Sequence, residues 1–104
     1  MGSSKSNLFT KQQNLLALWA KALSHPARIA ILEILASAKG CACGELVDKL
    51  PLSQATISQH LKAMKEAGLI KGHEQGRRVC YCIDESACMK AGASLQTLFS
   101  CCCC

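Results

Sequence analysis

Cysteine thiols are the most chemically distinctive side chains in this sequence, because nine of them occur among 104 residues. They fall into two Cys-x-Cys pairs (Cys41 with Cys43, Cys80 with Cys82), a single Cys88 and a terminal run of Cys101, Cys102, Cys103 and Cys104. Thiolates are soft ligands that suit As(III), Sb(III) and soft metal ions such as Cu(I). The odd count and the adjacent terminal cysteines make a poor disulfide framework. We therefore expect a reducing, cytoplasmic setting in which most thiols are free.

The first pair, Cys41-Ala42-Cys43, lies just before or at the start of a short predicted helix. A helix N-terminus lowers the pKa of a thiol and so favours the thiolate that binds metal. This position makes Cys41 and Cys43 the first candidates for a metal or metalloid site. The alternative is that both are simply small buried residues at a helix start.

The second pair, Cys80 and Cys82, alternates with Val79, Tyr81 and Ile83, so both thiols point to the same side of a predicted strand. They are a weaker candidate for a second soft-metal pair or for a redox pair. A disulfide between them is disfavoured, because Cβ atoms two residues apart on a strand are about 6–7 Å apart and a bridge needs about 3.8 Å. The alternative is again two small residues on a strand.

The elements that must position these thiols are mostly helical. Apolar residues recur at helical spacing in five segments, which begin near Leu8, Ala27, Cys43, Ser53 and Asp84 and end near residues 23, 38, 50, 68 and 100. Between the fourth and fifth helices the period changes to two, and residues 69–74 and 78–83 predict a β-hairpin around residues 75–77. The fold class is therefore α+β.

We expect the chain to form a single domain over residues 1–104, with a frayed N-terminus at 1–7 and a cysteine tail at 101–104. Aromatic residues are only 4 %, so the core must be aliphatic, which favours helices over a sandwich or barrel. Charged residues interrupt the apolar stretch from 15 to 38, so we expect no membrane partner. The chain also has no Gly-rich phosphate loop after a strand and no obvious Cys-His cleft, so we expect neither an enzyme nor a small-molecule substrate.

The short helix and the Ser53-capped helix, joined by a tight turn at Pro51, form a predicted helix-turn-helix, and the hairpin would be its wing. The second helix suits double-stranded DNA, because its polar face can meet base edges at its N-terminus and phosphates further along. The candidate DNA contacts on that helix are Ser53, Gln54, Thr56, Ser58, Gln59, Lys62 and Lys65. Those on the wing are His73, Arg77 and Arg78.

The charge of the whole chain is +5, and five basic residues against two acidic ones lie between Ser53 and Val79. This balance suits a polyanionic partner, although charge alone would fit an ordinary solvated helix face equally well. The capped helix, the glycine stop and the basic hairpin occurring together favour DNA binding.

Four segments resemble the ArsR-type (arsenic-repressor) family: Ala22–Ile29, Leu52–Leu61, Ala67–Ile70 and Gly76–Val79. The resemblance covers roughly residues 8 to 100. It implies a winged helix-turn-helix homodimer that represses a promoter until an inducer binds. It also implies pairing through the first and last helices, and the matching apolar residues are Leu15, Leu16, Trp19, Leu95, Leu98 and Phe99.

The same resemblance implies a metalloid or soft-metal site at Cys41 and Cys43, with As(III) or Sb(III) as the expected inducer and no cofactor required for folding. The sequence departs from the family's three-thiolate version, because the position three after Cys43 is Leu46. Residues 1–40 contain no cysteine, so the candidates for the third ligand are Cys101 to Cys104. The family's other site, an Asp and His set on the last helix, is disfavoured because that helix has no histidine.

Two further functions remain open. The cysteines could sense an oxidant or sulfide on the same DNA-binding fold, since exposed low-pKa thiols oxidise. More remotely, the chain could be a thiol-rich metal buffer without an operator. His60 lies at the edge of the apolar face of the Ser53-capped helix, and we expect it to pack or to hydrogen-bond rather than to bind metal.

Overall fold

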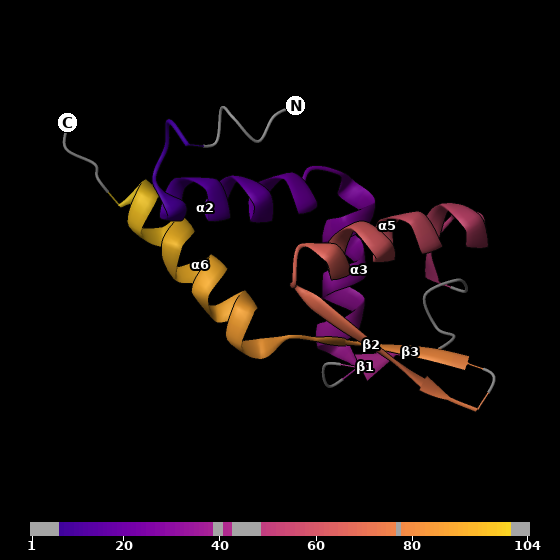
Figure 1. Ribbon diagram of the computed structural model, residues 1–104. Helices are drawn as coiled ribbons and strands as arrows, with labels where there is room; N and C mark the ends of the chain where they lie inside the picture. Colours follow the sequence, from indigo (N-terminus) through magenta and orange to yellow (C-terminus); the bar gives the residue numbers. More distant parts are fainter. Residues whose placement is uncertain (1–6, 39–40, 43–48, 77, 101–104) are drawn as a thin grey trace.

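The computed structural model describes residues 7–38, 41–42, 49–76 and 78–100. These residues form four α-helices and three β-strands, in the order α2 (Lys11–Ala22), α3 (Pro26–Ser37), β1 (Cys41–Ala42), α5 (Gln54–Glu66), β2 (Ile70–Gln75), β3 (Arg78–Ile83) and α6 (Glu85–Phe99). Figure 1 shows α2 beside α6, with the hairpin of β2 and β3 extending away from them. The predicted helix at residues 43–50 lies largely outside the described residues, as do the cysteine tail and residues 1–6.

Polar caps set the start of each described helix. Thr10 and Gln13 form a capping box, in which the Thr10 hydroxyl accepts from the Gln13 amide and the Gln13 side chain accepts from the Thr10 amide, each at 3.0 Å. This box explains why α2 begins at Lys11 and not at the predicted Leu8. The side chains of His25, Ser53 and Asp84 each accept from a backbone amide at the start of α3, α5 and α6, and the sequence predicts helix starts near Ala27 and at Ser53 and Asp84.

A sharp break separates α2 from α3. The two helices are bent by 89° relative to one another, and Pro26 occupies the start of α3, where its missing N–H costs nothing. No single helix among the described residues is long and apolar enough to cross a membrane, although α2 and α3 taken together reach that length and composition.

Gly68 links α5 to the sheet. Its φ of 82° lies in the left-handed region, and the amide of the next residue, Leu69, donates to the Met64 carbonyl at 3.1 Å. Glycine adopts this conformation without the steric cost that a side chain would add. The predicted glycine stop is therefore confirmed, and it turns the chain directly from α5 into β2.

The sheet has three antiparallel strands in the order β1-β3-β2. The β2–β3 pairing runs from Ile70 opposite Ile83 to Gln75 opposite Arg78, which confirms the predicted hairpin. The third strand, β1, was not predicted: Cys41 lies opposite Cys82 and Ala42 opposite Tyr81. A two-residue strand carries no alternating pattern that sequence inspection could detect.

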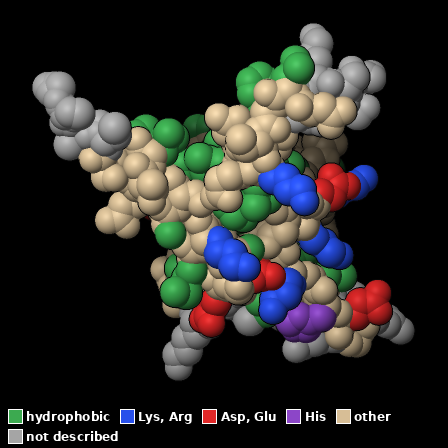
Figure 2. Space-filling view, turned by 60° about the vertical axis from the view of Figure 1, so that its left-hand side comes forward, with side chains coloured by type: hydrophobic (Ala, Val, Ile, Leu, Met, Phe, Trp, Pro, Cys, Tyr) green, Lys and Arg blue, Asp and Glu red, His purple; other side chains and the backbone are tan. Residues whose placement is uncertain are grey.

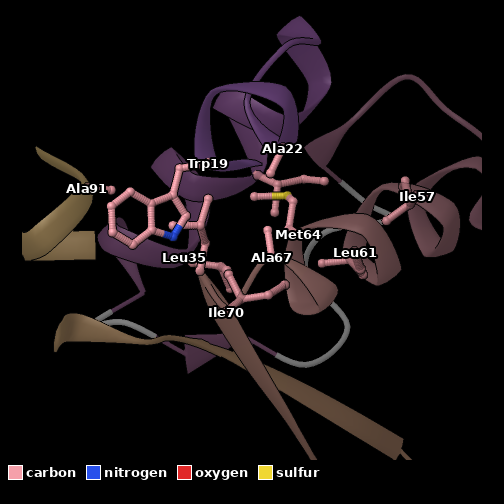
Figure 3. Packing of buried hydrophobic residues seen from close by; sticks show 11 residues of the cluster. Trp19, Ala22, Leu35, Ile57, Leu61, Met64, Ala67, Ile70 and Ala91 are labelled. Atoms are coloured by element: carbon pink, nitrogen blue, oxygen red, sulfur yellow. The ribbon is translucent and has the colours of Figure 1, made fainter. Parts of the chain in front are cut away.

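The core lies where α2, α3, α5 and α6 meet the base of the sheet. Ile31, Leu35 and Met64 are completely buried. Figure 3 shows the Trp19 ring between Ala91 of α6 and Leu35 of α3, with Met64 beside them. This cluster fixes α5 by its apolar face and leaves its other face to solvent.

Candidate nucleic-acid interface

The outward face of α5 is polar along its whole length. Ile57, Leu61 and Met64 are buried on the inner face. The residues on the opposite face are exposed, namely Gln54, Ser58, Gln59, Lys62 and Lys65. The amide and hydroxyl side chains therefore come before the lysine ammonium groups along the helix. In this order the N-terminal side chains can contact base edges and the lysines can contact phosphates.

Two predicted contact residues hold the start of α5 together. The Ser53 hydroxyl accepts from the Thr56 amide at 3.2 Å and donates to the Thr56 hydroxyl at 3.0 Å. Both hydrogen bonds of the Ser53 hydroxyl are thus used in the cap. The Thr56 hydroxyl can still donate a hydrogen bond to another acceptor. Ser53 serves α5 mainly by fixing the N-terminus that presents Gln54.

We name the hairpin of β2 and β3, residues 70–83, the wing. His73 is exposed on β2 and lies opposite Cys80, while Arg78 begins β3 opposite Gln75. Gly76, at the tip, has a φ of 65°, as a tight hairpin turn requires. Arg77, the remaining predicted wing contact, lies outside the described residues.

The base of the wing lies close to the end of α5. A Cβ added at Gly72 would lie 3.1 Å from Cε1 of Tyr81 and 3.6 Å from Nζ of Lys65. Only glycine fits this contact without a shift of the Tyr81 ring. The base of the wing and the end of α5 are therefore neighbours, so one ligand can meet both.

Several basic side chains are exposed on one face of the molecule. Figure 2 shows several Lys and Arg side chains on a single face, with a few Asp and Glu side chains between them. Such a face attracts a polyanion by an interaction that salt screens.

A cluster of His25, Arg28 and His60, which the sequence did not reveal, joins α5 to the α2–α3 break. Arg28 Nε donates to His60 Nδ1 at 3.1 Å, and its terminal nitrogen donates to the Lys21 carbonyl at 3.2 Å. The two imidazole rings lie 4.5 Å apart. His60 is 8 % exposed, which confirms the predicted packing and hydrogen-bonding role.

The neutral form of His60 is the one this cluster requires, because Nδ1 accepts a hydrogen bond from Arg28 Nε. Burial, with His25 and Arg28 adding to it, lowers the pKa of His60 from its ordinary 6.5. The unfolded chain binds this proton more tightly, so the stability contribution is complete above pH 6.5 and is lost as the pH falls through the lowered pKa.

We therefore expect the free energy of unfolding, measured with urea, to fall as the pH drops below 6.5. His60→Gln should flatten this dependence, because glutamine can accept from Arg28 without titrating. His73→Gln, which replaces an exposed imidazole, should leave the dependence as it is. Equal slopes for wild type and His60→Gln would show that other groups control acid stability.

The cysteines of β3 and α6 are in different states. Cys80 and Cys82 on β3 each take part in a disulfide bond, so the expectation of free thiols is wrong for these two residues; Cys80 is also 2 % exposed. Cys88 on α6 is free, its Sγ donates to the Leu69 carbonyl at 3.4 Å, and burial together with Asp84 raises its pKa. Cys88 is thus a packed thiol.

Cys41 lies in β1, ahead of the predicted short helix. Cys43 and the terminal cysteines lie outside the described residues. Within the part of the chain that the structure describes, no group of three or more His, Cys, Asp or Glu side chains is arranged to hold a metal ion.

The α2–α6 pair presents an apolar surface. Leu15, Leu98 and Phe99 are exposed, whereas Leu16 and Leu95 are half-buried. Trp19 is only 4 % exposed and packs inside the chain's own core. Gln12 Nε2 donates to Ser94 Oγ at 3.0 Å, which ties the two helices together.

Comparisons with known proteins agree with this arrangement. A helix-turn-helix domain family matches residues 23–73. The chain is 37 % identical over 79 residues to an HTH-type transcriptional regulator, YgaV, of Escherichia coli, covering 76 % of this chain and 80 % of that protein. It is 34 % identical over 61 residues to the arsenical resistance operon repressor of Staphylococcus xylosus, covering 59 % of this chain and 58 % of that protein.

A solved structure shows the same fold. The crystal structure of an ArsR family transcriptional regulator, RHA00566, superposes with a TM-score of 0.67 and 26 % sequence identity. The match covers 85 % of this chain and 92 % of that one. The elements that carry the polar face of α5 and the wing are thus those of a DNA-binding regulator.

Proposed function

Since this chain belongs to the ArsR family of winged helix-turn-helix transcriptional regulators, we propose that it contacts its operator through α5 and the wing and that a thiophilic inducer releases it. The chain is a DNA-binding repressor and not an enzyme. The observation that carries the proposed contacts is the exposed row of Gln54, Ser58 and Lys62 on α5, next to the wing.

Two substitutions separate base recognition from phosphate contact. Gln54 can make two hydrogen bonds to adenine, so Gln54→Ala should cost about 1–3 kcal/mol of binding at one base position and relax specificity there. Lys62→Ala should weaken binding to all sequences and reduce the slope of log K against log salt by about 1.

The measurement is fluorescence anisotropy on DNA from upstream of the chain's own gene and on a shuffled sequence, each at several salt concentrations. Lys11→Ala, which removes an exposed charge on α2, is the matched control and should leave the slope unchanged. A Gln54→Ala variant with unaltered sequence preference would remove this residue from the proposed contacts. Absence of DNA binding even at low salt would favour the metal-buffer alternative.

The inducer we propose is As(III) or Sb(III), held by Cys41 and Cys43. Soft thiolates favour such ions over harder metals, and the similarity to an arsenical resistance operon repressor supports this choice. The α6 helix begins with Asp84 and Glu85 and contains no histidine, which disfavours a harder-metal site there.

An oxidant- or sulfide-responsive switch is the second candidate function. The observation that favours it is that Cys80 and Cys82 are disulfide-bonded. Arsenic content and protein mass, measured together on reduced and treated samples, separate the two candidates. Release with bound arsenic supports the metalloid inducer. Release by peroxide or persulfide, with a mass shift and no metal, supports the thiol switch.

We also propose that the chain pairs with a second copy through α2 and α6. The exposed Leu98 and Phe99 on α6 and the exposed Leu15 on α2 support this, because apolar side chains of this kind are costly to leave in water. Leu98→Glu with Phe99→Glu should halve the mass in light scattering, from twice 11.1 kDa to that of one chain. Val79→Glu, on the exposed part of the wing, should keep the larger mass.

A further inference from the structure

A cavity of about 280 Å³ lies between α2, α3 and α5, and none of the proposed DNA contacts or cysteines lines it. Two helices contribute side chains at the same spacing of three and four residues, so one stripe of each helix faces the cavity. These stripes are Leu18, Lys21 and Ala22 of α2 and Ala63, Glu66 and Ala67 of α5. Pockets for drug-sized ligands measure about 300–1,000 Å³, so this cavity suits a smaller molecule.

Arg28 of α3 supplies a fixed cationic group to the same cavity. Its Nε donates to His60 Nδ1 at 3.1 Å, and Nη1 donates to the carbonyls of Lys21 at 3.2 Å and Ala22 at 3.4 Å. These bonds orient the guanidinium plane. Among the hydrogen bonds between described residues, none uses Nη2, which carries two further N–H donors. An oriented guanidinium with such donors is suited to bind a carboxylate.

Two further charged side chains of opposite sign line the cavity, namely Lys21 and Glu66, and both are exposed. Lys21 adds positive charge close to Arg28, because its own carbonyl accepts from that guanidinium. Glu66 is the one acidic residue among those that line the cavity, and it attracts an ammonium group and repels a second negative charge. The cavity thus offers cations for one anionic group, an anion for one cationic group and apolar side chains for the rest of a ligand.

We propose that this cavity binds a free α-amino acid with an aliphatic side chain. The carboxylate accepts from Arg28 Nη2, the ammonium group donates to Glu66, and the aliphatic side chain covers the exposed Leu18. The site is separate from the proposed thiophilic site and goes beyond the proposed function. It is formed by α2, the helix of the proposed pairing, and by α5, the helix of the proposed DNA contacts, so the ligand bridges the two.

The test is NMR of the ¹⁵N-labelled full chain, titrated with L-leucine and with two analogues that each lack one charge. We expect saturable shifts of the Ala22, Arg28 and Ala67 amides with leucine. 3-Methylbutylamine, which lacks the carboxylate, should bind about tenfold more weakly or worse, because charge-assisted hydrogen bonds to Arg28 are lost. 4-Methylpentanoate, which lacks the ammonium group, should bind about two- to fivefold more weakly, because Glu66 is exposed and its ion pair is solvated.

Glu66→Gln tests the ammonium contact. In this variant leucine and 4-methylpentanoate should bind equally. Glu33→Gln, which removes an exposed carboxylate of α3 outside the cavity, is the matched control and should keep the wild-type difference. Ala63→Leu should abolish leucine binding by filling the cavity, and the same NMR spectrum shows whether this variant is folded. Arg28 is left in place in both variants, because it also holds His60.

Two results would overturn the inference. One is that leucine causes no saturable shifts at the residues that line the cavity. The other is that wild type binds leucine and 4-methylpentanoate equally, since Glu66 would then have no part in binding. None of these measurements uses arsenite or DNA, so their failure is distinct from failure of the proposed function.

Discussion

The Cys41→Ser, Cys43→Ser double variant is expected to stay on operator DNA at arsenite concentrations that release the wild type. The reason is that serine hydroxyls are hard, poorly acidic groups that do not replace thiolates toward As(III). DNA affinity without arsenite should not change, because the substitutions leave α5 and its exposed polar face untouched. Anisotropy of the DNA complex during an arsenite titration measures both quantities.

Cys88→Ser is the matched control for this experiment. It removes a thiol from α6 that is free and packed against the Leu69 carbonyl. The control should respond to arsenite as the wild type does. A double variant that still releases DNA at the wild-type arsenite concentration would refute the assignment to Cys41 and Cys43.

Leu35→Ala is expected to lower the free energy of unfolding by about 2–5 kcal/mol, measured by urea denaturation. Leu35 is completely buried in the last turn of α3 and belongs to the core cluster that positions α5. Small domains have only about 5–15 kcal/mol in total, so the loss is a large fraction of the stability.

Ile29→Ala, on the same helix, is the control, because Ile29 is 43 % exposed. Its cost should be about 1 kcal/mol or less. If both variants lost the same free energy, the buried face of α3 would not contribute to the core as the structure describes.

Local signals in the sequence predicted most of the fold. Ser53 and Asp84 begin helices because short polar side chains satisfy free amides, and Gly68 ends α5 because it tolerates a φ of 82°. The change of period from 3.6 to 2 predicted the hairpin. These features depend on residues a few positions apart, which is why inspection of the sequence is sufficient.

Pairing between segments that are far apart in the sequence could not be predicted from local signals. The two residues of β1 gain their strand character only from β3, about forty positions later. For the same reason, the sequence left Cys41 and Cys82 in separate candidate sites. Arg28, which connects α3 with His60, is likewise an ordinary helix residue until the fold brings the two together.

The central claim is that a thiophilic ligand controls DNA binding by this chain. The measurement that tests it most directly is fluorescence anisotropy of the reduced protein on DNA from upstream of its own gene, titrated with arsenite. We expect a complex that forms without arsenite and dissociates near one equivalent per site. A complex that forms equally well and ignores arsenite would contradict the account, while leaving the DNA-binding face of α5 in place.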